Sequence, residues 1–381
     1  MTAIPGPHSA PPDGDRPDGT TSVGAGSAES GGPDGPLAPS SGRGTGAPHR
    51  PPALVGGLLL LAVVLVLLVW ASLAVGSGSV GMADVVRGVF SPDPHNKGQL
   101  IVQEVRIPRT AAGLLAGVAL GLAGTVMQGV ARNPLADPGI LGVNSGASAA
   151  VVLAMSVLGL SAPSQYIWFG FAGALVASVL VYGIGALGRE GATPLKLALS
   201  GAATSAVLMS LTTAMLLGDD KTFDQYRFWQ VGSLSGREAP VLWQALPFIV
   251  VGAVFALALG PKLNALSLGD DLARGLGQRV GPARLASAGA VVLLCGAATV
   301  VAGPIGFVGL VIPHAARIFT GPDYRWILPY SALLAPSLLL AADIVGRVIA
   351  RPGEVQVGIV TAAIGAIPFI VLVRRRDMAE L

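Results

Sequence analysis

Long apolar runs without charge constrain this chain more than any other feature of its sequence. Residues 53–75, 242–259 and 286–302 form runs of 17 to 23 residues with no Asp, Glu, Lys or Arg, about the length that an α-helix needs to cross a bilayer core. Their polarity does not alternate, as it would in the strands of a membrane barrel. Since 52% of the 381 residues are hydrophobic and 12% are charged, the chain carries more apolar surface than a water-soluble globule buries. The sequence predicts an all-α, polytopic membrane protein.

Hydropathy marks about ten transmembrane helices. The expected spans lie near residues 53–75, 108–130, 141–160, 165–187, 193–217, 240–260, 285–302, 305–320, 327–346 and 357–373. An even number of spans places both termini on one side of the membrane. The basic run Arg374, Arg375 and Arg376 follows the last span, and basic residues next to a span stay in the cytoplasm. We therefore expect a multi-pass protein of the cell membrane with both termini in the cytoplasm.

The chain divides into a tail and a membrane domain. Residues 1–52 are dominated by Pro, Gly, Ser and Asp and have too few large apolar side chains to offset the entropy lost on ordering. We expect a disordered, Pro/Gly/Ser-rich cytoplasmic tail at 1–52 and a transmembrane domain at 53–381. The first apolar run begins too far from the N-terminus, and is too long, for a secretory signal, so it is interpreted as a retained helix.

Small residues and helix breakers give two local predictions. Gly113, Gly117 and Gly121 recur every four residues, a pattern that favours close packing of neighbouring helices in a membrane. Glycines and prolines from Gly303 to Pro313 predict short or interrupted helices, which membranes tolerate where the backbone is buried in protein or lines a cavity.

Several function classes are excluded or disfavoured. The chain has no Gly-x-x-x-x-Gly-Lys-Ser/Thr sequence, so it lacks the phosphate-binding loop of that class of ATPases. A serine protease is disfavoured because Val143 stands where the Gly-x-Ser-Gly pattern around Ser145 needs glycine. An ion-coupled carrier, working alone, is less favoured because few ionisable groups fall at membrane depth. Basic residues do not cluster with aromatics, which disfavours nucleic acid, and we expect no metal site and no cofactor because the four histidines show no ligand spacing and Cys295 is the single cysteine.

One charged stretch, SLGDDLARGLG at residues 267–277, interrupts the apolar sequence after the sixth span. If it is helical, three leucines fall on one face at i, i+4 and i+8: Leu268, Leu272 and Leu276. Asp270 and Arg274 are then spaced for an i, i+4 ion pair. Two interpretations fit this pattern, a helix lying among lipid headgroups and an apolar face docked into the groove of a partner protein.

Three longer stretches give the chain a family resemblance. They are RIPRTAAGLLAGVALGLAGTVMQGVARNPLADPGILGVNSGA from Arg106, GPIGFVGLVIPHAARIFTGPDYR from Gly303, and ADIVGRVIARPGEVQVGIVTAAIGAIPFIVLV from Ala342. From about residue 53 to the C-terminus the chain resembles the FecCD-type permeases, the membrane subunits of bacterial ABC importers for ferric siderophores, haem and cobalamin. The resemblance implies the permease subunit of a type II ABC importer. Its cargo is a metal chelate, and a ferric siderophore is expected first, with cobalamin or haem as alternatives.

The resemblance also implies partners. It predicts a dimer with a second permease, either another copy or a paralogue, together with two cytoplasmic ATPase subunits and an extracytoplasmic solute-binding protein. ATP would be bound by the ATPase subunits, so the chain itself is not expected to be an enzyme.

Two groups of site residues follow from the resemblance. The family places its coupling helices after the sixth span, about 262–284 here, which favours partner docking for residues 267–277, called the coupling segment below. ATPase coupling is expected from Leu268, Asp270, Asp271, Leu272, Arg274, Gly275, Leu276 and Gly277. Docking of the binding protein is expected from Arg106, Arg109 and Arg347, at the positions where the family's permeases meet acidic side chains. The alternative is that these arginines anchor helices in headgroups, with Glu354 as a local partner for Arg347 or Arg351.

Overall fold

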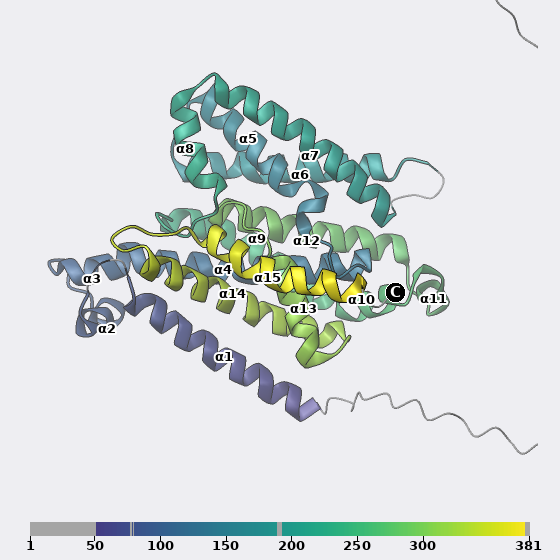
Figure 1. Cartoon of the computed structure of the whole chain (residues 1–381), viewed down its shortest axis with the longest axis horizontal. Helices are drawn as coiled ribbons and strands as arrows, with labels where there is room; N and C mark the ends of the chain where they lie inside the picture. The colour runs from purple at the N-terminus through teal and green to yellow at the C-terminus, as the bar shows by residue number, and fades with distance from the viewer. Residues whose placement is uncertain (1–50, 77, 79, 189–192, 378–381) are drawn as a thin grey trace, which may run out of the picture. The chain divides into compact units, whose positions relative to one another are not determined.

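The computed structural model describes residues 51–76, 78, 80–188 and 193–377 of the chain. Every regular element in these ranges is a helix (Figure 1), which confirms the all-α fold class. The expected tail lies outside the described residues, apart from Pro51 and Pro52 at the start of the first helix. Its disorder therefore stays a prediction.

Ten apolar helices correspond one to one with the ten expected spans. They are α1 (Pro51–Ala74), α4 (Ile107–Ala131), α5 (Val143–Leu158), α6 (Pro163–Gly185), α7 (Pro194–Leu217), α9 (Ala239–Ala258), α12 (Val280–Ala302), α13 (Val308–Thr320), α14 (Tyr324–Ile349) and α15 (Val357–Asp377). Within the described chain, seven of these helices are long and apolar enough to cross a membrane, and α5, α13 and the first part of α15 are shorter apolar helices. The expectation of about ten membrane helices is confirmed.

Shorter helices lie at the two ends of the long ones (Figure 1). At one end, called the α2 end, lie α2 (Met82–Phe90), α3 (Lys97–Ile101) and α8 (Asp220–Gln230). At the opposite end, called the α11 end, lie α10 (Gly260–Ser267) and α11 (Asp270–Gly275), close to the start of α1 and the end of α15. A π-helical turn, η1 (Val102–Arg106), leads into α4, and a 3-10 turn, η2 (Pro138–Leu141), precedes α5.

Helix α4 packs against α12, α13 and α14 in the centre of these helices. Its glycine row faces α14 at very short range, as the sequence predicts. A Cβ atom added to Gly121 would lie 2.6 Å from the Cβ of Ala335, and one added to Gly113 would lie 2.7 Å from Cδ2 of Leu340. A Cβ on Gly121 would also lie 2.6 Å from the backbone carbonyl oxygen of Ser331, which cannot move aside, so this glycine sets the distance between the two helices.

The helix path breaks between α12 and α13, where the sequence predicts an interruption. Gly303 and Phe307 adopt positive φ angles of 77° and 66°, and the backbone between them is not helical. Gly309 and Pro313, in contrast, lie inside α13, so the expectation that they interrupt a helix is wrong. Gly309 lies against Gly124 of α4, and a Cβ on Gly124 would collide with the backbone of Gly309, so Gly124 gives α13 room to approach α4.

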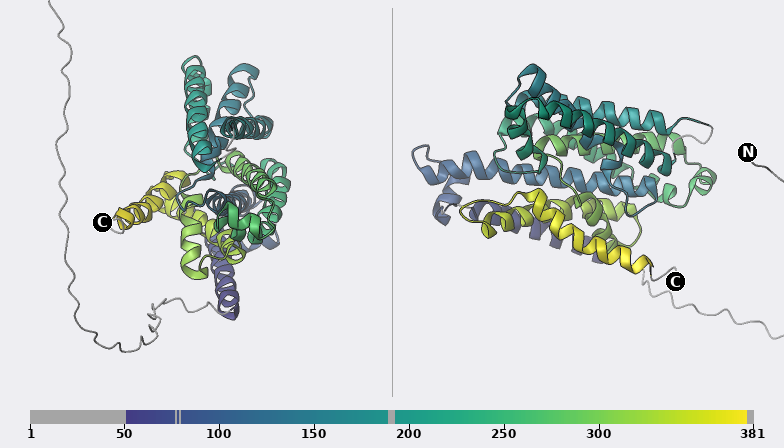
Figure 2. Two further views of the ribbon diagram at one scale, coloured as in Figure 1. Left: turned by 90° about the vertical axis from the view of Figure 1, so that its right-hand side faces the viewer. Right: turned by 45° about the horizontal axis from the view of Figure 1, so that its top comes forward.

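Helices α5, α6 and α7 form a second packed group beside α12 (Figure 2). Gly146 of α5 and Gly173 of α6 face each other, and a Cβ on either would collide with the carbonyl of the other. Small residues therefore set the packing distance here as they do between α4 and α14.

Candidate functional site

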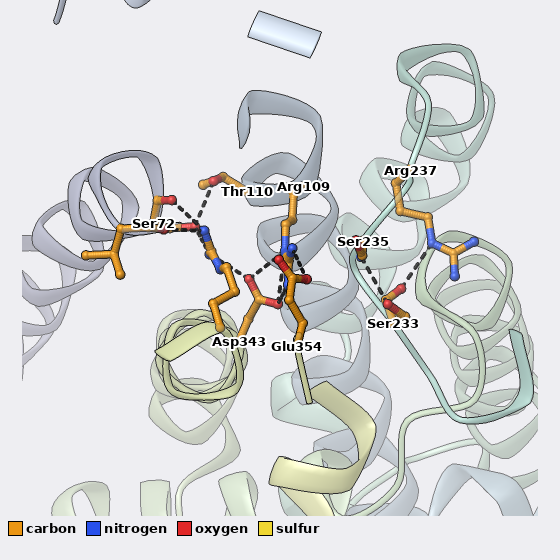
Figure 3. A network of polar contacts seen from close by, with 10 residues as sticks. Ser72, Arg109, Thr110, Ser233, Ser235, Arg237, Asp343 and Glu354 are labelled. Atoms are coloured by element: carbon orange, nitrogen blue, oxygen red, sulfur yellow. Dashed lines mark hydrogen bonds and ion pairs between the residues drawn. The ribbon is translucent and has the colours of Figure 1, made fainter. Parts of the chain in front are cut away.

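Two polar regions lie at opposite ends of the long helices. The coupling segment lies at the α11 end, and a network of arginines and carboxylates lies at the α2 end (Figures 1 and 3). Among the described residues, no group of three or more His, Cys, Asp or Glu side chains is placed to hold a metal ion.

The coupling segment is two helical pieces rather than one helix. Helix α10 ends at Ser267 and α11 begins at Asp270. Gly269 between them has a φ of 104°, a backbone conformation that L side chains rarely adopt. The expectation of one continuous helix from Ser267 to Gly277 is therefore wrong, because a glycine in this conformation ends the first helix.

The three leucines of the coupling segment are nevertheless all exposed. The exposed fractions are 56% for Leu268, 62% for Leu272 and 68% for Leu276, whereas Ala273 between them is fully buried. Ala273 thus seats α11 against the rest of the chain while the leucines point away from it. An apolar set this exposed at the end of a membrane domain is typical of a binding surface.

Asp270 holds α11 to two long helices. Its Oδ1 accepts a hydrogen bond of 2.9 Å from Nη2 of Arg284 on α12, and Nη2 of Arg132 lies 3.5 Å away. Arg132 is the C-cap of α4, directly after its last residue, in a left-handed conformation with φ of 51°. A movement of α11 would therefore act directly on the ends of α4 and α12.

The predicted pair of Asp270 and Arg274 is a minor contact. Their nearest charged atoms are 3.9 Å apart, and Arg274 donates its hydrogen bond of 2.9 Å to Asp271 instead. Asp271 and Arg274 are exposed, so this pair stabilises the fold little. Gly275 and Gly277 lie in open space, and Gly277 turns the chain with φ of 79°.

Helix α10 ties the same end to α14. Nδ2 of Asn264 donates to Oδ1 of Asp323 at 2.6 Å, and Oδ1 of Asn264 accepts from the backbone N–H of Tyr324 at 2.8 Å. Asp323 is the N-cap of α14. Asn264 thus holds α10, the helix that leads into the coupling segment, to the start of α14. The sequence indicated this residue only by its place within the loop at 262–284.

At the α2 end, Arg109 joins α4 to α14 and to the loop after α14 (Figure 3). Its Nε and Nη2 donate to the carboxylate of Asp343 at 2.7 to 3.1 Å, and its Nη1 donates to Glu354 at 2.7 Å. The sequence predicts Arg347 or Arg351 as a local partner for Glu354, and in the structure Glu354 accepts a hydrogen bond from Arg109. The planar guanidinium group of Arg109 thus donates hydrogen bonds to two carboxylates, one on each side of it.

Arg347 and Arg106 cap the C-terminal end of α1. Arg347 donates to the backbone carbonyls of Ser72 and Val75 at 2.8 and 2.7 Å and to Asp343 at 2.6 Å. Arg106 donates to the carbonyls of Leu73 and Ala74 at 2.6 and 2.8 Å. The last carbonyls of a helix have no partner within it, and a cation there also complements the helix dipole.

All three arginines expected to dock a binding protein are therefore occupied within the chain. Their exposed fractions are 4% for Arg106, 5% for Arg109 and 1% for Arg347. Docking by these side chains stays a prediction. The role that the structure does show is internal, since they hold α1, α4 and α14 together at the α2 end. One feature of the sequence could have indicated this role. Asp343 stands four residues before Arg347, the spacing at which an acid and a base pair on one helix.

The chain is similar to known transport proteins over most of its length. The model of the FecCD transport family matches residues 64–375. The ferric enterobactin transport system permease protein of Escherichia coli (strain K12) is 48% identical over 322 residues, which cover 84% of this chain and 95% of that protein. The iron(3+)-hydroxamate import system permease protein of Bacillus subtilis (strain 168) is 40% identical, over 86% of this chain and 84% of that protein.

A solved structure has the same fold. It is described as an inward-facing conformation of a metal-chelate type ABC transporter, and it superposes with a TM-score of 0.73 at 28% sequence identity. The superposition covers 84% of this chain and 99% of the other.

Proposed function

Because the chain belongs to the FecCD transport family of ABC transporter permease subunits, we propose that it carries a ferric siderophore across the cell membrane into the cytoplasm. The observation that supports this cargo is the 48% identity to a ferric enterobactin permease along nearly the whole of both membrane domains. Cobalamin and haem are the alternative cargoes.

The driving energy comes from ATP that partner subunits bind and hydrolyse. The sequence has no phosphate-binding loop of its own. The coupling segment is the docking surface for those ATPase subunits, with Leu268, Leu272 and Leu276 entering an apolar groove and Asp271 and Arg274 at its rim. The exposure of the three leucines over a buried Ala273 supports this assignment.

Movement of the docked segment reaches the membrane helices through specific contacts. Asp270 links α11 to Arg284 of α12 and Arg132 of α4, and Asn264 links α10 to the N-terminus of α14. Closure of the ATPase dimer would shift these helix ends together and switch the permease between outward- and inward-facing states.

The α11 end is the cytoplasmic end in this proposal, so both termini are cytoplasmic. The extracytoplasmic solute-binding protein then docks at the α2 end, next to a second permease that is a copy or a paralogue. There the three arginines contribute by holding the surface in shape, since their own guanidinium groups are bonded within the chain.

Uptake of radiolabelled chelates tests the cargo. Iron-limited cells with and without the gene are given ferric siderophores, haem and cobalamin. If deletion of the gene abolishes uptake of one class of ferric siderophore, the proposal is supported. If it abolishes only haem uptake or only cobalamin uptake, that compound is the cargo instead. Uptake that survives replacement of the catalytic glutamate in the partner ATPase would indicate a carrier that works alone and would remove the coupling role.

A further inference from the structure

A polar cavity of about 390 Å³ opens at the α2 end, beside the arginine network. Its wall includes Arg109 of α4, Tyr166 at the start of α6, Arg237 in the loop after α8, and Glu354 in the loop before α15. Exposed residues such as Ser235, Gly236 and Glu354 form part of the wall, so the cavity is open to the surface. None of the roles described above uses Arg237.

The loop at 232–237 holds Arg237 in a defined position. Gly232 has a φ of 75°, its carbonyl accepts from the N–H of Gly358, and the next N–H, of Ser233, donates to Ala302 at 2.8 Å. Leu234 is fully buried. Backbone hydrogen bonds thus fix the loop to the end of α12 and the start of α15, and they hold the backbone of Arg237 in place.

Arg237 uses one part of its guanidinium group within the chain. Its Nε donates to the carbonyl of Ser233 at 3.0 Å (Figure 3). Among the described residues no carboxylate forms an ion pair with its terminal nitrogens. Other arginines of the described chain do have a carboxylate at 3.5 Å or less, namely those at 109, 132, 227, 274, 284 and 347. Arg237 is therefore a cation with donor capacity left over.

The charges around the cavity leave this cation unbalanced. In the neighbouring network the two carboxylates, Asp343 and Glu354, are already engaged by Arg109 and Arg347, and Arg106 is bonded to backbone carbonyls. Burial lowers the pKa of Arg237 from its usual value, and nearby Tyr166 acts in the opposite direction. Glu238, the next residue in the chain, is exposed and forms no ion pair with Arg237 within the described residues. A partly desolvated guanidinium without an ion pair gains free energy when an anion binds it.

We propose that Arg237 is an anion-binding residue of the substrate path, where its terminal nitrogens bind an anionic oxygen of the metal chelate as it enters the cavity. This inference rests on the proposed function and specifies its substrate class as chelates with net negative charge. Ferric catecholates and ferric citrate carry such oxygens around the metal, whereas neutral ferric hydroxamates offer no net charge to the site. Arg is suited to the task because its planar fork binds two oxygens at once.

Transport in liposomes tests the subsite. The full chain is reconstituted with its ATPase and binding protein, and uptake of ferric enterobactin, ferric citrate and a neutral ferric hydroxamate is measured against concentration. Arg237→Gln should raise the half-saturating concentration of the anionic chelates roughly 10- to 100-fold and leave that of the neutral chelate unchanged. Arg237→Lys should retain part of the effect, because it keeps the charge and loses the fork.

Arg227→Gln is the matched control. Arg227 is exposed on α8, at the same end of the chain, and pairs with Asp224 at 3.3 Å. The control should transport all three chelates like the wild type, which separates a local site from the general surface charge.

Three results would overturn the subsite while leaving the importer function intact. The first is that Arg237→Gln transports anionic chelates as well as the wild type does. The second is that Arg237→Gln loses transport of anionic and neutral chelates equally. The third is that the wild type carries the neutral chelate alone. If the wild type carries anionic chelates alone, the neutral chelate cannot serve as the comparison, and binding of the chelate-free binding protein to the permease is measured instead. Unchanged binding to Arg237→Gln supports the subsite. Weakened binding would mean that Arg237 contacts the binding protein rather than the chelate. Failure of the wild type to carry any chelate would overturn the proposed function and the subsite with it.

Discussion

Arg109 of α4 and Asp343 of α14 are joined by three hydrogen bonds, of 2.7, 3.0 and 3.1 Å, across 234 residues of sequence. Both side chains are buried in membrane helices, and Asp343 also accepts a hydrogen bond of 2.6 Å from Arg347. One carboxylate therefore separates two guanidinium groups that would otherwise repel each other in a medium of low dielectric constant. Asp343 is thus the shared counter-charge of the two arginines that link α4 and α14 at the α2 end.

Replacement of Asp343 by Asn should destabilise the protein strongly. The change leaves the two buried arginines without their shared counter-charge, and such a loss costs about 3–5 kcal/mol in the free energy of unfolding. Thermal unfolding of the purified protein in detergent measures the effect. Asp224→Asn, at an exposed ion pair, is the control and should change the free energy by less than about 1 kcal/mol. Equal unfolding midpoints for the two variants would contradict the role given to Asp343.

Replacement of Gly117 by Ala should also destabilise the protein, for a steric reason. The new Cβ would lie 2.6 Å from N and 2.8 Å from Cβ of Pro336 on α14, and neither helix backbone can move without separating the pair. Overpacking of this kind costs about 1–3 kcal/mol. Gly289 of α12 has nothing within 4 Å of an added Cβ, so Gly289→Ala should be neutral or slightly stabilising. Similar unfolding midpoints for both alanine variants would show that the helices do not touch as described.

The spans and one helix-contact face could be predicted from the sequence because these signals are local. In a membrane, an apolar run such as residues 53–75 can pair its backbone N–H and C=O groups by itself only as a helix, and it forms α1. The glycine row at 113, 117 and 121 indicated a contact face without indicating its partner. That partner, α14, lies about two hundred residues further along the chain, and no local pattern identifies it.

The site was predicted less well, because its geometry depends on tertiary contacts. The spacing of three leucines indicated an apolar surface, and all three are exposed, but the positive φ of Gly269 divides the expected helix. Their role in coupling stays a prediction. The arginines at 106, 109 and 347 lie at helix ends, as expected. Their partners are carbonyls of α1 and carboxylates of distant segments, so charge alone suggested an external role where the structure shows internal bonds.

Leu272→Asp should abolish binding of the ATPase subunits without affecting the fold. Leu272 is exposed on α11, so a carboxylate there costs nothing in the free chain, but it would be desolvated in an apolar groove. Co-purification of the ATPase with the tagged permease measures binding, and yield in the membrane measures folding. Leu272→Met keeps the apolar surface and should bind normally. Normal co-purification of Leu272→Asp would assign the leucines to the lipid surface instead.

Two neighbouring substitutions, Asp270→Asn and Asp271→Asn, should separate binding of the ATPase from transmission of its movement to the membrane helices. The two carboxylates differ in their surroundings. Asp270 holds Arg284 at 2.9 Å, whereas the side chain of Asp271 is 99% exposed. Without the Asp270 charge, α11 can still dock its leucines, but its movement is transmitted less firmly to α4 and α12. The number of chelates transported per ATP hydrolysed should then fall roughly fivefold, the lower end of measured coupling energies, and Asp271→Asn should match the wild type. Both rates are measured in the same liposomes. An equal ratio of transport to hydrolysis in the two variants would mean that force reaches the membrane helices by another route, and the contact of Asn264 with the N-terminus of α14 would be the next to test.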